Sequence, residues 1–130
     1  MTHMELESVL NLSPQLEEID RYIRCNIDQP LTREVLADMA GYSVPHFHRV
    51  FIGRKGESAA SYIRRLRLRR AGYKLRLGAV DIGEVALAAG YASHAAFGKA
   101  FKKQYGVSPS AFRQLGCWEA TRLLREEQDS

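Results

Sequence analysis

The chain has 130 residues, 45% of them hydrophobic and 26% charged, which suffices for the core of one domain or of two very small ones. No apolar run approaches the roughly 18 residues of a membrane span, and the first residues lack the plan of a signal peptide, so we expect a cytoplasmic protein. Cys25 and Cys117 lie too far apart to suggest a zinc site or a disulfide framework, so we expect both thiols to be reduced. The net charge of +4 is unevenly distributed: residues 1–31 carry a net −4, residues 32–116 a net +10 and residues 117–130 a net −2, so the middle of the chain favours a polyanionic partner or else forms a solvated basic face.

The first predicted element is a helix within residues 16–30. Four apolar residues recur there at helical spacing: Leu16, Ile19, Ile23 and Ile27. Pro30 lies beyond the expected end of this helix. We expect the helix to pack on the segment that follows it.

One unit of sequence occurs twice, at residues 35–58 and 85–108. At an offset of 49, Ala37, Ala40, Gly41 and Tyr42 match Ala86, Ala89, Gly90 and Tyr91. After a one-residue insertion, Ser43, Phe47, Phe51, Gly56 and Ser58 match Ser93, Phe97, Phe101, Gly106 and Ser108. The repeat predicts that the chain contains the same structural unit twice.

Each unit is predicted to form two helices joined by a tight turn. Gly41 and Gly90 can supply the positive φ of a sharp helix exit, and Ser43 and Ser93 are suited to cap the second helices. Apolar residues at spacings of three and four define an inward face on those helices: Phe47, Val50 and Phe51 in the first, and Phe97, Ala100 and Phe101 in the second. A basic second helix with one free face is the helix-turn-helix plan for entering a DNA major groove.

The stretch HFHRVF, residues 46–51, places two histidines and an arginine on one of these second helices. His48 and Arg49 are expected to point outward, with Pro45 one turn earlier; an arginine can bond O6 and N7 of guanine, and a histidine can bond a base edge. A metal site is disfavoured because His46 and His48 lie on divergent faces and no cysteine or carboxylate stands at ligand spacing. A catalytic site is disfavoured because no nucleophile with a partnered base can be recognised in the sequence. A plain surface helix is the remaining alternative.

Residues 58–78, between the two units, predict one long helix with seven arginines and lysines. About 20 residues give a length on the order of 30 Å, close to the roughly 34 Å between successive major grooves on one side of B-DNA. An amphipathic connector with its arginines in solvent is the alternative. Gly72 costs about 1 kcal/mol relative to alanine inside a helix, and it allows a kink.

The last segment, residues 117–130, has two interpretations. It can form a short helix that buries Trp118 and Leu123, or it can be the beginning of a linker to a further domain. The 130 residues themselves leave no room for an effector-binding domain beside the two units.

These stretches together resemble the DNA-binding region of the AraC/XylS family of bacterial transcription regulators, over about residues 15–115. The similar stretches are LADMAGYSVPHFHRVF, GESAASYIRRLRLRRA, IGEVALAAGY and FKKQYGVSPSAFR, in the family's order and spacing. The HFHRVF stretch and the helix after it are most similar to members that carry this region at the N-terminus, some of which continue into a GyrI-like effector-binding domain.

The resemblance implies an all-α fold of about seven helices. Two homeodomain-like helix-turn-helix subdomains of three helices each would be joined by a long linker helix. The first subdomain, with the N-terminal helix, would occupy residues 1–57, the linker helix 58–78, the second subdomain 79–116 and a C-terminal tail 117–130.

The resemblance also implies which residues meet DNA. Base-reading positions fall on Pro45, His48 and Arg49 in the first unit, and on His94, Ala95, Ala96 and Lys99 in the second. Contacts to the DNA backbone fall on Ser43, His46, Arg64, Lys102 and Arg113. Lys99 stands where the family usually has arginine, and it lacks the planar fork of a guanidinium. The two alanines offer only apolar contact. The second unit is therefore expected to contribute more to affinity for the DNA backbone than to recognition of the DNA sequence.

We therefore expect a sequence-specific DNA-binding transcription regulator that inserts two recognition helices into successive major grooves. Activation is the expected direction, although the sequence leaves repression open. The partners would be double-stranded DNA, bound by a monomer, and RNA polymerase; no membrane, cofactor, metal or enzymatic activity is expected. The alternative from another class is a protein-interaction adaptor, for example to RNA polymerase, with mainly nonspecific DNA affinity, and a sensor of an apolar ligand near Trp118 is a remoter one.

Overall fold

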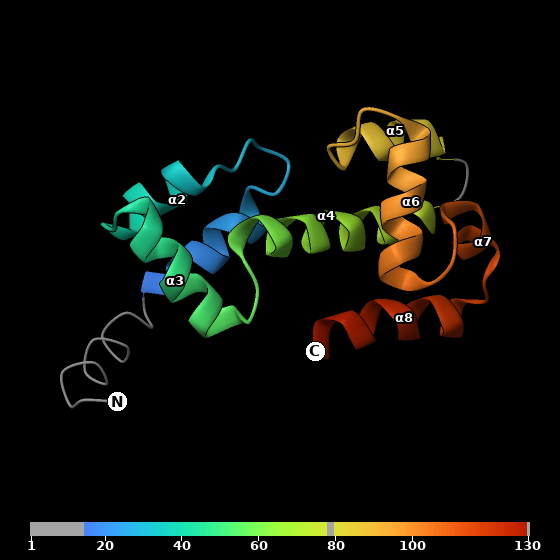
Figure 1. Ribbon diagram of the computed structural model, residues 1–130. Coiled ribbons are helices and arrows are strands. Elements are labelled where there is room, and N and C mark those ends of the chain that lie inside the picture. Colours follow the sequence, from blue (N-terminus) through green and yellow to red (C-terminus); the bar gives the residue numbers. More distant parts are fainter. Residues whose placement is uncertain (1–14, 78–79, 130) are drawn as a thin grey trace. The chain divides into compact units, whose positions relative to one another are not determined.

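The computed structural model describes residues 15–77 and 80–129, and all regular structure within them is helical (Figure 1). The described residues contain no strand, so the predicted all-α fold class is confirmed. The chain divides in sequence between Ile63 and Arg64 into two compact units.

The first unit contains both helices of the first sequence repeat. A helix over residues 15–25 comes first, α2 (Arg33–Ala40) and α3 (Val44–Lys55) follow, and the beginning of α4 (Ala59–Leu75) completes the unit. Gly41, at φ +77°, ends α2, and the Ser43 side chain accepts a hydrogen bond from the His46 amide at 3.3 Å. The predicted turn glycine and helix cap are therefore confirmed.

The core of the first unit is apolar and partly aromatic. The four apolar residues predicted for the first helix are all buried, and so are Phe47 and Phe51 of α3. The Phe51 ring centroid lies 5.6 Å from that of Phe47 and 5.6 Å from that of Tyr62 on α4, within the range of favourable aromatic pairing. Val50, predicted on the same inward face, is half-buried at its edge.

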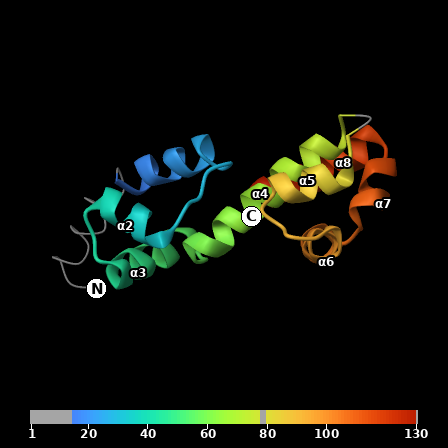
Figure 2. The same cartoon turned by 90° about the horizontal axis from the view of Figure 1, so that it is seen from above.

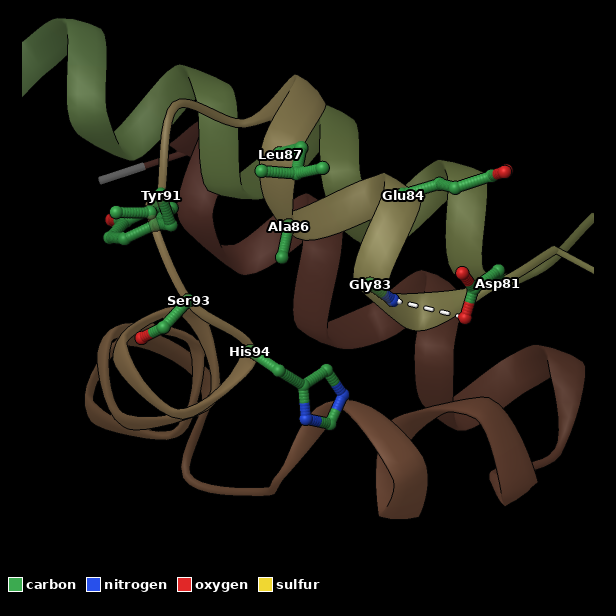
Figure 3. A pocket seen from close by; sticks show the side chains of 9 residues that line it. Asp81, Gly83, Glu84, Ala86, Leu87, Tyr91, Ser93 and His94 are labelled. Atoms are coloured by element: carbon green, nitrogen blue, oxygen red, sulfur yellow. Dashed lines mark hydrogen bonds between the residues drawn. The ribbon is translucent and has the colours of Figure 1, made fainter.

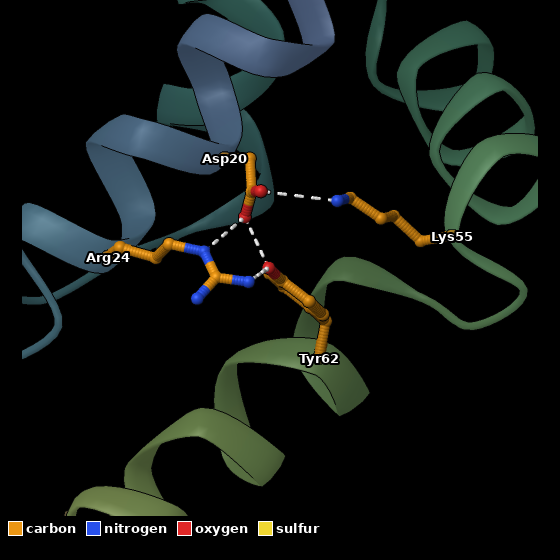
Figure 4. A network of polar contacts seen from close by, with 4 residues as sticks. All are labelled: Asp20, Arg24, Lys55 and Tyr62. Carbon is orange, nitrogen blue, oxygen red and sulfur yellow. Dashed lines mark hydrogen bonds and ion pairs between the residues drawn. The ribbon is translucent and has the colours of Figure 1, made fainter. Parts of the chain in front are cut away.

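A polar network joins three segments of the first unit (Figure 4). Asp20 of the first helix accepts a hydrogen bond from the Tyr62 hydroxyl and lies 3.2 Å from Nζ of Lys55 at the end of α3. Arg24 donates from Nε to Asp20 at 3.2 Å and from Nη2 to the Tyr62 hydroxyl at 3.0 Å. The network thus fixes the end of α3 against the first helix and α4.

The charge state of Asp20 depends on this network. Burial alone would raise the pKa of Asp20, but the hydrogen bonds from Tyr62 and Lys55 and the charges of Lys55 and Arg24 outweigh it and hold the pKa below the usual 3.8. Burial and the hydrogen bond to Asp20 raise the pKa of Tyr62 to about 12. The pair is therefore an ionised carboxylate and a neutral phenol at neutral pH.

The second unit contains the second sequence repeat and two further helices. It comprises the part of α4 from Arg64 on, α5 (Ile82–Ala88), α6 (His94–Tyr105), α7 (Pro109–Gln114) and α8 (Cys117–Asp129). Gly90 has a φ of +93°, and the Ser93 side chain accepts from the Ala96 amide at 3.0 Å, as the repeat predicts. Figure 2 views α6 almost along its axis while α5 lies across the view, so α6 crosses α5 steeply.

Four rings form the centre of the second core. Phe101 lies 5.7 Å from Phe97, 4.8 Å from Tyr105 and 5.3 Å from Phe112 of α7, measured between ring centroids. Ala100, predicted on the inward face, packs against this core while half-buried. At its edge, Nη1 of Arg76 donates to the backbone carbonyls of Phe112, Arg113 and Leu115, at 3.3, 3.1 and 2.7 Å. These bonds give hydrogen-bond partners to carbonyls at the end of α7, of which the Phe112 carbonyl also accepts from the Leu115 amide at 3.1 Å.

The tail forms a helix, but the prediction that it buries Trp118 is wrong. Trp118 is 76% exposed, Leu123 is half-buried against the core, and Ala120 and Leu124 are buried in it. Ala120 and Leu124 are four residues apart and share one face of the helix, whereas Trp118 points to another. Nor does the glycine of α4 interrupt its helix, which runs continuously through Gly72 to Leu75.

Truncation of one inward phenylalanine should destabilise one unit and spare the other. We expect Phe47→Ala to lower the free energy of unfolding of the first unit by about 3 to 5 kcal/mol, and Phe101→Ala to do the same to the second, because each removes a buried ring. Amide hydrogen exchange can follow the units separately. Met39, which is 48% exposed, provides the control: Met39→Ala should change stability by less than about 0.5 kcal/mol. Full stability of either phenylalanine variant would mean that the inward face of that helix is misplaced.

Loss of the Asp20 charge should destabilise the first unit in a pH-dependent way. A carboxyl whose pKa is lowered by folding stabilises the fold above its ordinary pKa of 3.8, and this contribution is lost as the pH falls through the lower pKa of the folded state. Asp20→Asn should cost about 1 to 2 kcal/mol at neutral pH, as expected for charge-assisted bonds partly open to water. Urea unfolding of both proteins at a series of pH values should show the difference shrinking in acid; a constant difference would assign the effect to shape alone.

Candidate nucleic-acid interface

The outer face of α3 carries the three residues predicted to read bases in the first unit. Pro45, His48 and Arg49 are all exposed, and their spacing of three and four residues places them on one face of the helix. This face is turned outward because Phe47 and Phe51 anchor the opposite one in the core. Arg49 makes no hydrogen bond or ion pair with any of the described residues, so its guanidinium is available to a ligand.

The outer face of α6 differs in chemistry from that of α3. The predicted residues His94, Ala95, Ala96 and Lys99 are exposed, and so is Lys102. At the repeat offset of 50, Gly98 stands where α3 has His48, and Lys99 stands where α3 has Arg49. The second helix therefore presents ammonium groups, methyl groups and the His94 imidazole, where the first presents a guanidinium and the His48 imidazole.

The start of α3 is held in place by contacts of two predicted backbone-binding residues. The Ser43 oxygen caps the helix, and its hydroxyl hydrogen is still able to donate to an external oxygen. The half-buried His46 ring lies 4.7 Å from the Tyr42 ring, between centroids, and the Tyr42 hydroxyl donates to Oε1 of Gln15 at 2.7 Å. His46 is thus positioned by packing rather than free to rotate in solvent.

The other predicted backbone contacts lie in different surroundings. Arg64 and Lys102 are exposed, but Arg113 is half-buried and donates from Nη2 to the carbonyl of Val80. Nε of Arg113 is buried without a hydrogen-bond partner among the described residues. Arg113 therefore supports the residue that precedes the cap of α5, and only part of its guanidinium faces outward.

A pocket of about 310 Å³ lies where α5 and α6 meet, beside His94 (Figure 3). Asp81 and Glu84 line it, and they are the only two acidic residues in the sequence between Arg64 and Gly116. Oδ1 of Asp81 accepts from the Gly83 amide at 3.3 Å and so begins α5. The pocket is therefore a local negative site beside the start of the basic helix α6, and phosphate groups should avoid it.

Tyr91 forms one wall of this pocket, and its hydroxyl is buried with no hydrogen-bond partner in the described chain. Burial raises the pKa of Tyr91, although the positive charges of Arg64 and Arg67 act in the opposite direction. Tyr91 matches Tyr42 in the sequence repeat, but the Tyr42 hydroxyl donates a hydrogen bond to Gln15 at the protein surface. The two repeats thus use the same residue in different environments.

The sequence prediction missed several residues at these surfaces. Arg54 and Lys103 are exposed near the ends of α3 and α6, and their charge was the available signal. The isolation of Asp81 and Glu84 in a basic segment was the signal for the pocket.

Within residues 15–77 and 80–129, no group of three or more His, Cys, Asp or Glu residues could hold a metal ion. No helix in that part of the chain combines the length and the apolar character that crossing a membrane requires.

Comparison with known proteins places this arrangement among DNA-binding proteins. A family model described as a helix-turn-helix domain matches residues 36–115. The chain is 36% identical over 99 residues to the transcriptional regulator Rob of Salmonella typhimurium, covering 76% of this chain but 34% of Rob. It is 33% identical over 98 residues to the regulatory protein SoxS of Escherichia coli, covering 75% of this chain and 92% of SoxS.

The same likeness extends to solved structures. The DNA-binding domain of the transcriptional factor AdpA, crystallised in complex with a target DNA, superposes with a TM-score of 0.69 at 27% identity, covering 76% of this chain and 89% of that domain. The chain spans about a third to a half of the length of the first curated relatives that it matches, at 34% and 49%. The similarity therefore concerns the two helix-turn-helix units, and α8 lies beyond the residues that the family model matches.

Proposed function

This chain belongs to the AraC/XylS family of helix-turn-helix proteins, and on that premise we propose that it is a sequence-specific DNA-binding transcription regulator. One observation carries the proposal: the same helix-turn-helix unit occurs twice, and each second helix is anchored by two buried phenylalanines so that its opposite, cationic face is exposed. The net charge of +10 over residues 32–116 supports a polyanionic partner.

The proposed mode of binding divides the work between the two helices. On α3, Arg49 bonds O6 and N7 of a guanine, His48 bonds a neighbouring base edge, and Pro45 makes an apolar contact. On α6, Lys99 and His94 approach base edges while Ala95 and Ala96 meet thymine methyl groups. Because one chain carries both helices, a monomer would suffice to place them in successive major grooves.

Backbone contacts complete the proposed interface. Ser43, His46, Arg64 and Lys102 are placed at the exposed or half-buried surface where phosphate oxygens could reach them. Arg113 contributes less than the others in this proposal, because its guanidinium already bonds the Val80 carbonyl. Such contacts give affinity and position but carry no sequence information.

The regulatory outcome is also part of the proposal. We propose activation of transcription, with RNA polymerase as a second partner, and no enzymatic step. The competing function is an adaptor that binds a protein and holds DNA only nonspecifically. Sequence preference on DNA separates the two, because an adaptor needs none.

Selection of bound sites from random duplex DNA should recover a preferred, asymmetric sequence, because the two reading faces differ. Binding to this sequence, measured by electrophoretic shift at low and moderate salt, should weaken steeply as salt rises, since each neutralised phosphate releases counterions. Sedimentation should show one protein per site. Equal binding to all duplexes would favour the adaptor, and weak binding at every salt concentration would contradict both functions.

Arg49→Ala should relax sequence choice while sparing general affinity. We expect the preferred site to weaken by about 1 to 3 kcal/mol and nonspecific duplex to be bound almost unchanged, because base-edge contacts specify and phosphate contacts do not. Arg54→Ala provides a matched control for specificity: Arg54 is an exposed arginine of the same helix outside the proposed reading face, so its loss should affect preferred and nonspecific duplexes equally. An equal loss on all DNA from Arg49→Ala would reassign Arg49 to the phosphate contacts.

A further inference from the structure

Gly72 creates a notch in α4 that a residue of α8 fills. An ideal Cβ built on Gly72 would lie 2.8 Å from Cδ2 of Leu124, closer than real side chains approach. The same Cβ would lie 3.7 Å from ring atoms of Phe101 on α6 and Phe112 on α7. We call these four residues the α8 clasp: Gly72, Phe101, Phe112 and Leu124.

Leu124 has little room to retreat from the notch. Its side chain is 2% exposed, and it belongs to the same core cluster as the two phenylalanines. Those rings pack edge to face with centroids 5.3 Å apart, so they cannot separate without losing their own contact. A methyl group at position 72 would therefore have to displace Leu124 against packed rings, and overpacking of this kind is destabilising.

The clasp connects α8 to the outer face of α6. Phe101 is the middle one of three buried residues on the inward face of α6, and Lys99 and Lys102 stand on the exposed side of the same helix. Because a rigid helix turns as one body, the support of Phe101 sets the direction of those lysines. Since α8 begins at Cys117, after the last residue matched by the family model, this support comes from outside the matched region.

We propose that α8 is a working part of the second DNA-binding unit, in which Leu124, seated in the Gly72 notch, is a positioning residue for α6. The effect on DNA affinity rests on the proposed function, but the structural role of Leu124 can be tested without it. The opposing view is that α8 is a passive tail whose loss of packing leaves α6 unchanged.

The notch is tested by a double-mutant cycle on the full chain. Alanine is ordinarily the better residue inside a helix, and Gly53, whose ideal Cβ meets nothing within 4 Å, supplies the control: Gly53→Ala should raise the melting temperature. Gly72→Ala should instead lower the melting temperature by about 5 °C. In a Leu124→Ala background the sign should reverse, because the clash is gone. If Gly72→Ala raised the melting temperature in both backgrounds, the proposal that Leu124 fills a notch at Gly72 would be wrong.

The positioning role is tested by exchange and by DNA binding, well below the melting temperature of each variant. Leu124→Ala should speed amide exchange in α6 by about tenfold or more and leave α3 unchanged, whereas Leu124→Met should stay close to the unaltered chain. Affinity for duplex DNA should fall about tenfold with Leu124→Ala and recover with Leu124→Met. Unchanged exchange in α6, or unchanged affinity in a protein that binds DNA, would overturn the proposal. If the unaltered chain binds no DNA, the proposed function fails, and the cycle and the exchange rates still decide whether α8 positions α6.

Discussion

The structure depends on one constraint, which is the burial of two phenylalanines spaced four residues apart on each of two helices. Phe47 and Phe51 fix the rotation of α3 about its own axis, and Phe97 and Phe101 fix that of α6. Everything on the outer faces follows from this rotation, because a residue three or four places from another shares its side of the helix. The left-handed glycines and serine caps set where each helix begins and ends, but the aromatic rings decide which residues face outward.

The features that the sequence predicts are those set by local spacing. The helix caps at Ser43 and Ser93, the sharp exits at Gly41 and Gly90 and the inward phenylalanines all depend on residues within a turn or two of one another. The features that it missed depend on distant pairs: Arg113 meets the carbonyl of Val80 across 33 residues, and Leu124 meets a notch at Gly72. One of the two interpretations of the tail was a helix that buries Trp118 and Leu123, but the packing of Ala120 and Leu124 sets the rotation of α8. The candidate DNA contacts were named from the family resemblance, and in the structure they are exposed or half-buried at the surface. Their roles in DNA binding stay predictions.

The two units share a fold but offer different chemistry to a nucleic acid. The first presents a planar guanidinium with fixed donor directions, and the second presents ammonium groups whose donors rotate. The second also places the carboxylates of Asp81 and Glu84 together in one pocket at the start of α6, where the repeat gives the first unit Thr32 and Val35 at the matching positions. In the proposed function, the duplicated unit thus keeps one helix for choosing sequence and uses the other for holding the duplex, while both helices keep the same cap and the same pair of buried phenylalanines.

The exposure of Trp118 has a spectroscopic consequence. It is the only tryptophan of the chain and lies 76% exposed near the start of α8, so its indole is already hydrated in the folded state. Its emission should resemble that of the free amino acid and change little on unfolding, which makes intrinsic fluorescence a poor measure of folding for this protein. The same property makes the indole a label-free reporter of anything that covers α8, because only a covering surface would move its emission towards the blue.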